Sequence, residues 1–188
     1  IWRADGVVGN RLLNEYEIFG QRIDATTGEL KGTPQFVISD TFDDGDTNSV
    51  YPRTPVVAYN SVADEYFAIW TTAFSEIKGQ RLAGDTGANI GDDFIINDDD
   101  DDGTGSPDVE FSPESNRFLI VWSGYQETGG LIRNEFEIFG RFVSGTGLFI
   151  GDTIRISDMG PDGNGSYDAL FPRIAYSDGG RFLVVWEG

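Results

Sequence analysis

The strongest constraint on the fold is a repeat that runs through the whole chain. Its clearest part is a short apolar segment ending in Trp, found at Tyr66–Trp70, Phe118–Trp122 and Phe182–Trp186. Ile1-Trp2 matches the last two residues of this segment. Each copy also contains an Ile-x-Gly sequence, which ends at Gly20, Gly79 and Gly140 and recurs about every 60 residues. Tandem periods of this order are typical of β-propeller blades.

Each period predicts four short strands, because apolar and β-branched runs alternate with turn residues and no helical periodicity is present. Thr-Gly turns join the last two strands of each period, and Gly supplies the positive φ that tight turns need. The predicted first strands are Pro55–Tyr59, Pro107–Phe111 and Pro172–Tyr176, and the second strands are the Trp-ending segments. The third strands are Glu17–Ile23, Glu76–Leu82 and Glu137–Val143, and the fourth are Phe36–Ser39, Phe94–Asn97 and Ile154–Ser157.

These strands predict an all-β fold, a β-propeller segment built of four-stranded antiparallel blades. We treat residues 1–188 as one segment, with repeats at approximately 1–54, 55–106, 107–171 and a partial 172–188. Twelve strands make three blade equivalents, whereas closed propellers use four to eight blades. We therefore expect a longer parent protein, with a six-bladed ring of two copies or an open array as alternatives. Further blades of the same or a second chain are the expected partners.

The charge of the chain is strongly negative, with 32 acidic against 13 basic residues and a net charge of −19. Such a field repels nucleic acid and anionic membrane surfaces, so neither is an expected partner. No apolar segment approaches the roughly 20 residues that span a bilayer, so membrane insertion is not expected. The chain contains no Cys and no His, which excludes disulfides and thiolate sites. Any bound metal should be a hard ion with oxygen ligands, and calcium is the first candidate.

Acidic connections between the predicted blades are the strongest candidate metal sites. All three follow the pattern Asp-x3-Asp-Gly, with further side-chain oxygens at alternate positions. A calcium ion needs six to eight oxygen ligands, which such a turn can bring together. The alternative is that these Asp-Gly and Asn-Gly sequences are solvated turns on an acidic surface. The candidate ligands are Asp40, Asp44, Asp46, Asn48, Asp98, Asp100, Asp102, Thr104, Ser106, Asp158, Asp162, Asn164 and Ser166.

The repeat Phe-Leu-Val-Val-Trp … Glu-Ile-Phe-Gly-Gln-Arg resembles repeats of large secreted and surface-anchored bacterial proteins. The acidic connections are loosely similar to the calcium loops of FG-GAP propellers such as integrin α subunits, although they lack the closing Glu. The resemblance implies an extracellular or cell-surface β-propeller, mostly without assigned activity. Phe142 departs from it, since the other copies have Arg22 and Arg81 at this position. We expect a structural or adhesive module with calcium-stabilised loops, and not an enzyme.

The alternative from another class is a lectin-like propeller that binds glycans, with other surface proteins as further candidate partners. Trp residues beside acidic loops could stack on sugars, but we expect them to pack between blades, over the repeated Gly residues. Glu17, Glu76 and Glu137 could be glycosidase carboxylates, but they repeat, which favours structural ion pairs with Arg22 and Arg81. Hydrolysis is therefore the weakest interpretation of the sequence.

The loops between the second and third strands differ in length. They are long at Arg3–Tyr16 and Ser123–Phe136 and short at Thr71–Ser75. In a meander these loops lie on the same face as the acidic connections, so they are candidate binding loops. Alternatively, their apolar residues only extend the hairpins. The loop residues of interest are Arg3, Arg11, Leu12, Leu13, Tyr125, Leu131, Ile132 and Arg133.

Overall fold

A computed structural model describes residues 2–5, 16–39, 51–73, 75–97, 102–126 and 130–188. These residues form thirteen strands and no helix. Among them, no helix has the length and apolar character needed to cross a membrane. The strands are β1 (Trp2–Asp5), β2 (Tyr16–Ile23), β3 (Leu30–Val37), β4 (Arg53–Asn60), β5 (Glu65–Thr71), β6 (Ile77–Ala83), β7 (Asn89–Ile95), β8 (Asp102–Ser112), β9 (Arg117–Tyr125), β10 (Glu137–Ser144), β11 (Phe149–Arg155), β12 (Leu170–Ser177) and β13 (Arg181–Glu187).

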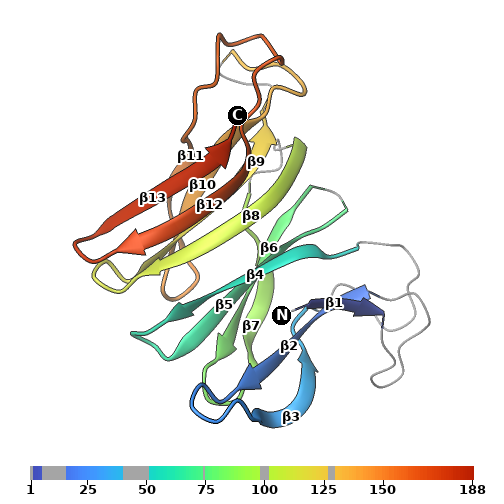
Figure 1. Ribbon diagram of the computed structural model, residues 1–188, viewed down its shortest axis with the longest axis vertical. Coiled ribbons are helices and arrows are strands. Elements are labelled where there is room, and N and C mark those ends of the chain that lie inside the picture. Colours follow the sequence, from blue (N-terminus) through green and yellow to red (C-terminus); the bar gives the residue numbers. More distant parts are fainter. Residues whose placement is uncertain (1, 6–15, 40–50, 74, 98–101, 127–129) are drawn as a thin grey trace.

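The strands form four antiparallel sheets in chain order (Figure 1). Sheet 1 contains β1–β3, sheet 2 contains β4–β7, sheet 3 contains β8–β11, and sheet 4 contains β12 and β13. Sheets 2 and 3 are complete four-stranded meanders, each strand pairing with the next one along the chain. The predicted all-β class and the four-stranded antiparallel sheets are therefore confirmed.

The pairing register repeats from sheet to sheet. Val121 pairs with Gly140 in sheet 3, and Ile69 pairs with Gly79 in sheet 2. The next residue of each second strand is the repeated Trp, which pairs with the residue before the Gly. Trp2 pairs in the same way with Phe19, the residue before Gly20. The prediction that Ile1-Trp2 ends a further Trp strand thus agrees with the backbone pairing of β1.

The fourth strands begin earlier than predicted. They are β3, β7 and β11, which start directly after the Thr-Gly turns and end before Ser39, Asn97 and Ser157. These three side chains leave the ladder and accept backbone N–H bonds from Ile18, Ile77 and Ile138, at 2.8, 2.7 and 2.7 Å. The sequence analysis placed Ser39, Asn97 and Ser157 inside the fourth strands. It did so because the apolar pattern does not show where a side-chain oxygen takes the place of a backbone acceptor.

Alternate residues of each second strand pack on opposite neighbouring sheets. In β5, Ala68 and Trp70 face sheet 1, whereas Phe67 and Ile69 face sheet 3. In β9, Leu119 and Val121 face sheet 4. A strand in a buried meander has both faces covered, so it is apolar at every position. The repeat is therefore typical of several sheets packed face to face, and not of one sheet with a solvent-exposed face.

The predicted burial of Trp between sheets is confirmed for Trp70 and Trp122, which are fully buried. The expectation that Trp rings lie over the repeated Gly residues is wrong. A Cβ on Gly79 would meet Phe67, and one on Gly140 would meet Ile156. The reason is the register. Each Trp pairs with the residue before the Gly, so its ring lies on the face of the sheet opposite to the one on which a Cβ of the Gly would lie.

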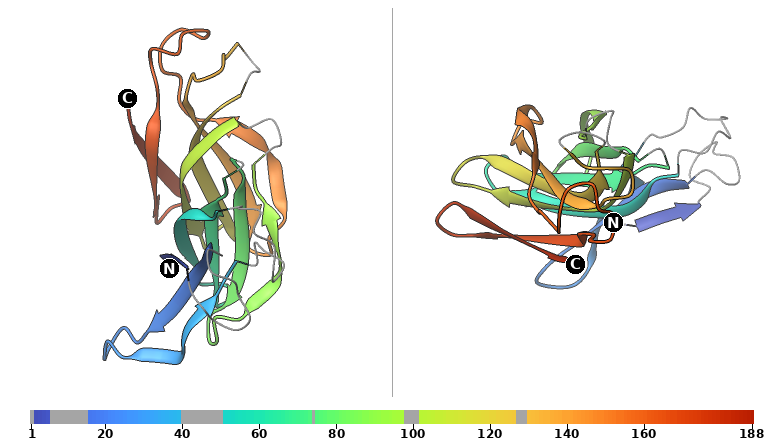
Figure 2. Two further views of the ribbon diagram at one scale, coloured as in Figure 1. Left: turned by 90° about the vertical axis from the view of Figure 1, so that its right-hand side faces the viewer. Right: turned by 90° about the horizontal axis from the view of Figure 1, so that it is seen from above.

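The sheets fan outward from their first strands (Figures 1 and 2). β4 contacts β8, and β8 contacts β12, so the first strands lie side by side at the centre of the fan. This arrangement is compatible with propeller blades. Among the described residues the fan is open, with an incomplete sheet at each end.

Candidate functional site

The third acidic connection, 156–169, is organised around the guanidinium of Arg155. Its Nη2 donates to Glu137 Oε1 at 2.8 Å and to Asp158 Oδ1 at 2.9 Å. Its Nη1 donates to Asp162 Oδ1 at 2.8 Å, and its Nε donates to the carbonyl of Ser157 at 3.0 Å. Two of the predicted calcium ligands are thus brought together, but around an arginine.

The carboxylate at the centre of this cluster is fully buried. Glu137 Oε2 accepts from Ser157 Oγ, and Oε1 also accepts from the backbone N–H of Met159 at 2.8 Å. Partial burial alone would lower the pKa of Arg155, but hydrogen bonds to Asp162 and Glu137 raise it above its ordinary value. The cluster is therefore an ion-pair network, in which Arg155 supplies a positive charge shared by the carboxylates of Glu137, Asp158 and Asp162.

Arg155 has no counterpart in the other two copies. It pairs with Phe139, and the equivalent partners of Phe19 and Lys78 are Val37 and Ile95. Of the three copies, the third alone has a cation at this register position. Sequence reasoning passed over Arg155 because it lies on a strand, three residues before the acidic pattern begins.

The remaining predicted ligands of the third connection form a local turn. Ser166 N–H donates to the carbonyl of Asn164 at 2.8 Å and to its Oδ1 at 3.2 Å. This is the behaviour expected of a polar turn-forming residue. Asn164 and Ser166 are thus joined in a hydrogen-bonded turn.

The second connection is shorter than predicted. Asp102, Thr104 and Ser106 lie inside β8, where Asp102 pairs with Tyr125 and Gly105 pairs with Ser123 around two register shifts. Gly103 and Ser106 have positive φ, as such irregularities require. These residues are thus part of a bulged strand and not of a loop. Asp98 and Asp100 lie outside the described residues.

The ligands predicted in the first connection, Asp40, Asp44, Asp46 and Asn48, also lie outside the described residues. Within the described part of the chain, no group of three or more Asp, Glu, His and Cys side chains is arranged to hold a metal ion. Calcium binding in the first two connections stays a prediction.

A second buried carboxylate, Glu135, joins two loops on the same face. Its Oε2 accepts from the backbone N–H of Ile132 at 3.0 Å, and both of its oxygens accept from Gly163 N–H, at 3.2 and 3.0 Å. Asp168 Oδ1 accepts from Phe136 N–H at 3.2 Å nearby. The predicted neighbourhood of the long loop and the acidic connection is confirmed here. We call residues 130–136 and 158–169 the loop platform.

The loop platform has both buried and exposed apolar residues. Leu131 is buried in the core between sheets 2 and 3, whereas Ile132 is half exposed. Tyr167 packs beside Gly160, where a Cβ would lie 2.6 Å from its ring, yet it remains 50% exposed. The burial of Leu131 agrees with the interpretation of these loops as extensions of the hairpins, and the interpretation as binding loops stays a prediction. The side chain of Arg3 and all of Arg11, Leu12 and Leu13 lie outside the description.

The repeated Glu residues have a structural arrangement. Glu17 is buried and accepts from Ser39 Oγ, as Glu137 accepts from Ser157. Glu76 accepts instead from Thr72 Oγ1 at 3.2 Å, because Asn97 replaces the serine in that copy. Each carboxylate thus accepts a hydrogen bond from a hydroxyl at the end of its own sheet, in agreement with the structural interpretation.

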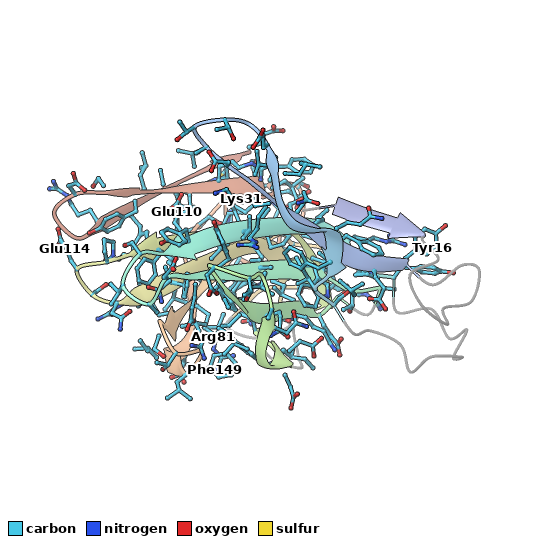
Figure 3. All side chains as sticks on the ribbon, turned by 90° about the horizontal axis from the view of Figure 1, so that it is seen from below. Tyr16, Lys31, Arg81, Glu110, Glu114 and Phe149 are labelled. Carbon is cyan, nitrogen blue, oxygen red and sulfur yellow. The ribbon has the colours of Figure 1, made fainter. Side chains whose placement is uncertain are left out.

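The expected pairs of these Glu residues with Arg22 and Arg81 are wrong. Residues five apart on a strand point to opposite faces. Arg81 instead forms an ion pair with Glu65 of β5, with Nη2 and Oε2 2.7 Å apart. Its Nη1 also donates to the carbonyl of Thr146, in the turn between β10 and β11 of sheet 3, at 3.1 Å. Figure 3 labels Arg81 of sheet 2 and Phe149, which lies at the start of β11 in sheet 3.

Comparisons with known proteins bear on the fold. A scan against protein-family models gives no match, and a search of curated proteins gives none either. Among solved structures, the chain is similar to an endo-arabinase from Bacteroides thetaiotaomicron VPI-5482, with a TM-score of 0.51 and 13% sequence identity. The likeness covers 91% of this chain and 60% of the endo-arabinase chain, so this chain spans less than two thirds of its length. At this identity the likeness shows a shared fold alone.

Proposed function

We propose that the chain is a rigid structural segment of an extracellular β-propeller and that its loop platform is an adhesive surface. The observation that carries the proposal is the Glu135 carboxylate, which is fully buried and holds backbone N–H groups of both platform loops. Loops fixed in this way present their exposed side chains in one arrangement, which lowers the entropic cost of binding. Sheets 1 to 4 would be consecutive blades, and further blades would complete the ring.

Calcium would act in the first two connections. The residues equivalent to Arg155 there are Val37 and Ile95, which bring no positive charge. A divalent ion bridging loop carboxylates would cancel their mutual repulsion and fix the blade-to-blade path. The third connection needs no ion in this scheme, because Arg155 already pairs with its carboxylates.

We expect calcium to raise the midpoint of thermal unfolding, Tm. Saturation at about 100 times Kd would add about 2.7 kcal/mol, or roughly 5–10 °C for a chain of this size. The measurement is thermal melting in CaCl2 and in chelator at equal ionic strength. Asp44→Asn with Asp46→Asn should reduce the calcium-dependent rise, whereas Asp158→Asn in the third connection should leave it unchanged. Equal Tm values in calcium and chelator would remove calcium from the account.

The second candidate is glycan binding by the same platform. It is favoured by the fold shared with a protein described as an endo-arabinase and by the exposed Tyr167 ring beside a polar loop. Aromatic faces are common contacts for flat ligands, and Tyr offers both an apolar face and a polar hydroxyl. Hydrolysis has less support, since the buried Glu17 and Glu137 are hydrogen-bonded within their own sheets.

A binding survey over glycans, arabinan among them, and over matrix proteins tests the platform. Tyr167→Ala should weaken any platform ligand about tenfold, the loss expected for one stacked ring. Tyr59→Ala is the matched control, because Tyr59 is 46% exposed against 50% for Tyr167 and lies on β4. Equal losses for both variants would show that the ligand binds elsewhere. Binding of matrix proteins without binding of glycans would favour the adhesive surface over the glycan-binding platform.

A further inference from the structure

The loop platform contains the single Asn-Gly sequence of the chain, Asn164-Gly165. Both residues lie between β11 and β12, where Asn164 is half buried and Gly165 is exposed. The side-chain amide of an asparagine can be attacked by the backbone nitrogen of the next residue. A glycine at that position leaves the approach open, because it has no Cβ. This turn is therefore a place where the chain can modify itself.

The groups that would react are free in this turn. Among the residues that the structure describes, the N–H of Gly165 and the Nδ2 of Asn164 donate no hydrogen bond. The Oδ1 of Asn164 accepts from the N–H of Ser166 at 3.2 Å. This bond polarises the amide carbonyl and stabilises the negative charge that develops on its oxygen during attack. The attacking nitrogen is thus available and the attacked carbonyl is activated.

Two Asp-Gly sequences, which could cyclise in the same way, have the N–H of their glycine held by a carboxylate. The N–H of Gly163 donates to both oxygens of Glu135, at 3.2 and 3.0 Å. The N–H of Gly179 donates to Glu114 Oε1 at 3.0 Å. A hydrogen bond to a charged acceptor must break before the nitrogen can attack, which slows the attack by about tenfold or more. This protection is absent at Gly165 in the described part of the chain.

We propose that Asn164 is a site of spontaneous deamidation, through which the loop platform slowly gains a carboxylate. The nitrogen of Gly165 loses its proton and forms a bond to Cγ of Asn164, and the Cγ–Nδ2 bond breaks with release of ammonia. Water then opens the cyclic imide at either carbonyl, which gives aspartate or isoaspartate at this position. The reaction consumes only water, so it is a property of the chain itself and does not depend on a ligand at the platform.

The product would disturb the contact between the two platform loops. A Cβ on Gly165 would lie 3.1 Å from the carbonyl oxygen of Asn134, so the turn already packs closely on the other loop. Isoaspartate adds one methylene to the backbone at this point, and its carboxylate enters a connection that is already acidic. We therefore expect the backbone N–H bonds to Glu135 to open more often in the modified chain.

Peptide mapping by mass spectrometry tests the proposal on protein aged at neutral and at alkaline pH. The peptide with Asn164 should gain the mass of an exchange of NH2 for OH. The rate should rise with pH, because the attack requires loss of the Gly165 proton. An isoaspartyl methyltransferase should label the same peptide, since one of the two products is isoaspartate.

Two other asparagines are internal controls. Asn116 is exposed but is followed by an arginine, so it controls for exposure. Asn60 has a similar turn, since its Oδ1 accepts from Val62 N–H at 3.0 Å, but it is buried and its Nδ2 donates to a backbone carbonyl. Both should deamidate at least about tenfold more slowly than Asn164. Equal rates at the three sites, or a faster rate at Asn116, would overturn the proposal.

Glu114→Ala tests whether a held N–H protects such a pair. Glu114 is exposed, so its loss should leave the fold intact. The variant frees the N–H of Gly179, and labelling of Asp178 by the isoaspartyl methyltransferase should therefore rise. Unchanged labelling would remove the reason for singling out Asn164 and would count against the proposal.

Hydrogen exchange at the Ile132 and Gly163 amides measures the effect on the platform. Both amides should exchange about tenfold faster in the isoaspartate form than in fresh protein. Asn164→Gln, whose longer side chain disfavours ring closure, should age without this change. Freshly prepared Asn164→Asp has the added charge but the normal backbone length, so its effect should be smaller. Unchanged exchange in the fully modified chain would overturn the link between deamidation and the platform loops.

Discussion

Replacing Arg155 by Met is expected to lower the free energy of unfolding by about 3 kcal/mol, the lower part of the range for breaking a buried ion pair. The loss follows because Glu137 is fully buried, while Arg155 is only one quarter exposed and is the cation with which it pairs in the described part of the chain. Asp158 and Asp162 would lose their partner as well. Urea denaturation monitored by Trp fluorescence measures the change.

Two further variants separate this effect from the loss of any surface cation. Lys31→Met removes a cation whose side chain is 56% exposed and pairs with Asp24 at the surface, so the change should be much smaller. Adding Glu137→Gln to Arg155→Met should restore part of the stability, because a neutral amide no longer leaves a buried charge. If the double variant is as unstable as the sum of the single ones, the ion pair is not the cause.

The second large effect is expected for Phe67→Ala, at about 3–5 kcal/mol. Phe67 is almost fully buried and joins β5 of sheet 2 to Phe118 of sheet 3. Its removal would open a cavity between sheets 2 and 3. The measurement is the free energy of unfolding in urea, with Phe149→Ala as the control. Phe149 is 45% exposed and stacks on Arg141, so its loss should cost about 1 kcal/mol.

Gly79→Ala provides a consistency check on the position of Phe67. In the unmodified chain the added Cβ would collide with the Phe67 ring, which should cost roughly 1–3 kcal/mol. In a Phe67→Ala background the penalty should shrink, since the two nearest atoms to the added Cβ belong to the Phe67 ring. Gly105→Ala, with its nearest neighbour 3.8 Å from the added Cβ, should be nearly neutral in both backgrounds. Strict additivity would contradict the packing described for this interface.

The sequence was sufficient for the features that recur in every copy. The Trp-ending strands, the Ile-x-Gly strands and the Thr-Gly turns predicted the order of the strands and the burial of Trp70 and Trp122. A repeat reports positions that every copy needs, and these are the positions where each sheet packs on the next. The apolar residues on both faces of β5 and β9 were visible for the same reason.

Features confined to one copy could not be predicted in this way. Arg155 has no counterpart in the other two copies. Glu135 has a counterpart in the sequence, Glu15, but its contact with the loop residue Gly163 leaves no signal in the repeat pattern. The acidic residues of the third connection were predicted to bind calcium, and two of them, Asp158 and Asp162, pair with Arg155 of the same chain. The early end of the fourth strands was missed because Ser39, Asn97 and Ser157 replace backbone acceptors with side-chain oxygens.

The central claim is that one four-stranded meander is repeated in the same register, sheet after sheet. Nuclear Overhauser contacts between backbone protons of paired strands test it most directly. We predict contacts between Trp2 and Phe19, Trp70 and Lys78, and Trp122 and Phe139, three equivalent pairs in three separate sheets. Backbone contacts that instead join β5 to a strand of sheet 3, as in a two-layer sandwich with shared sheets, would contradict the account.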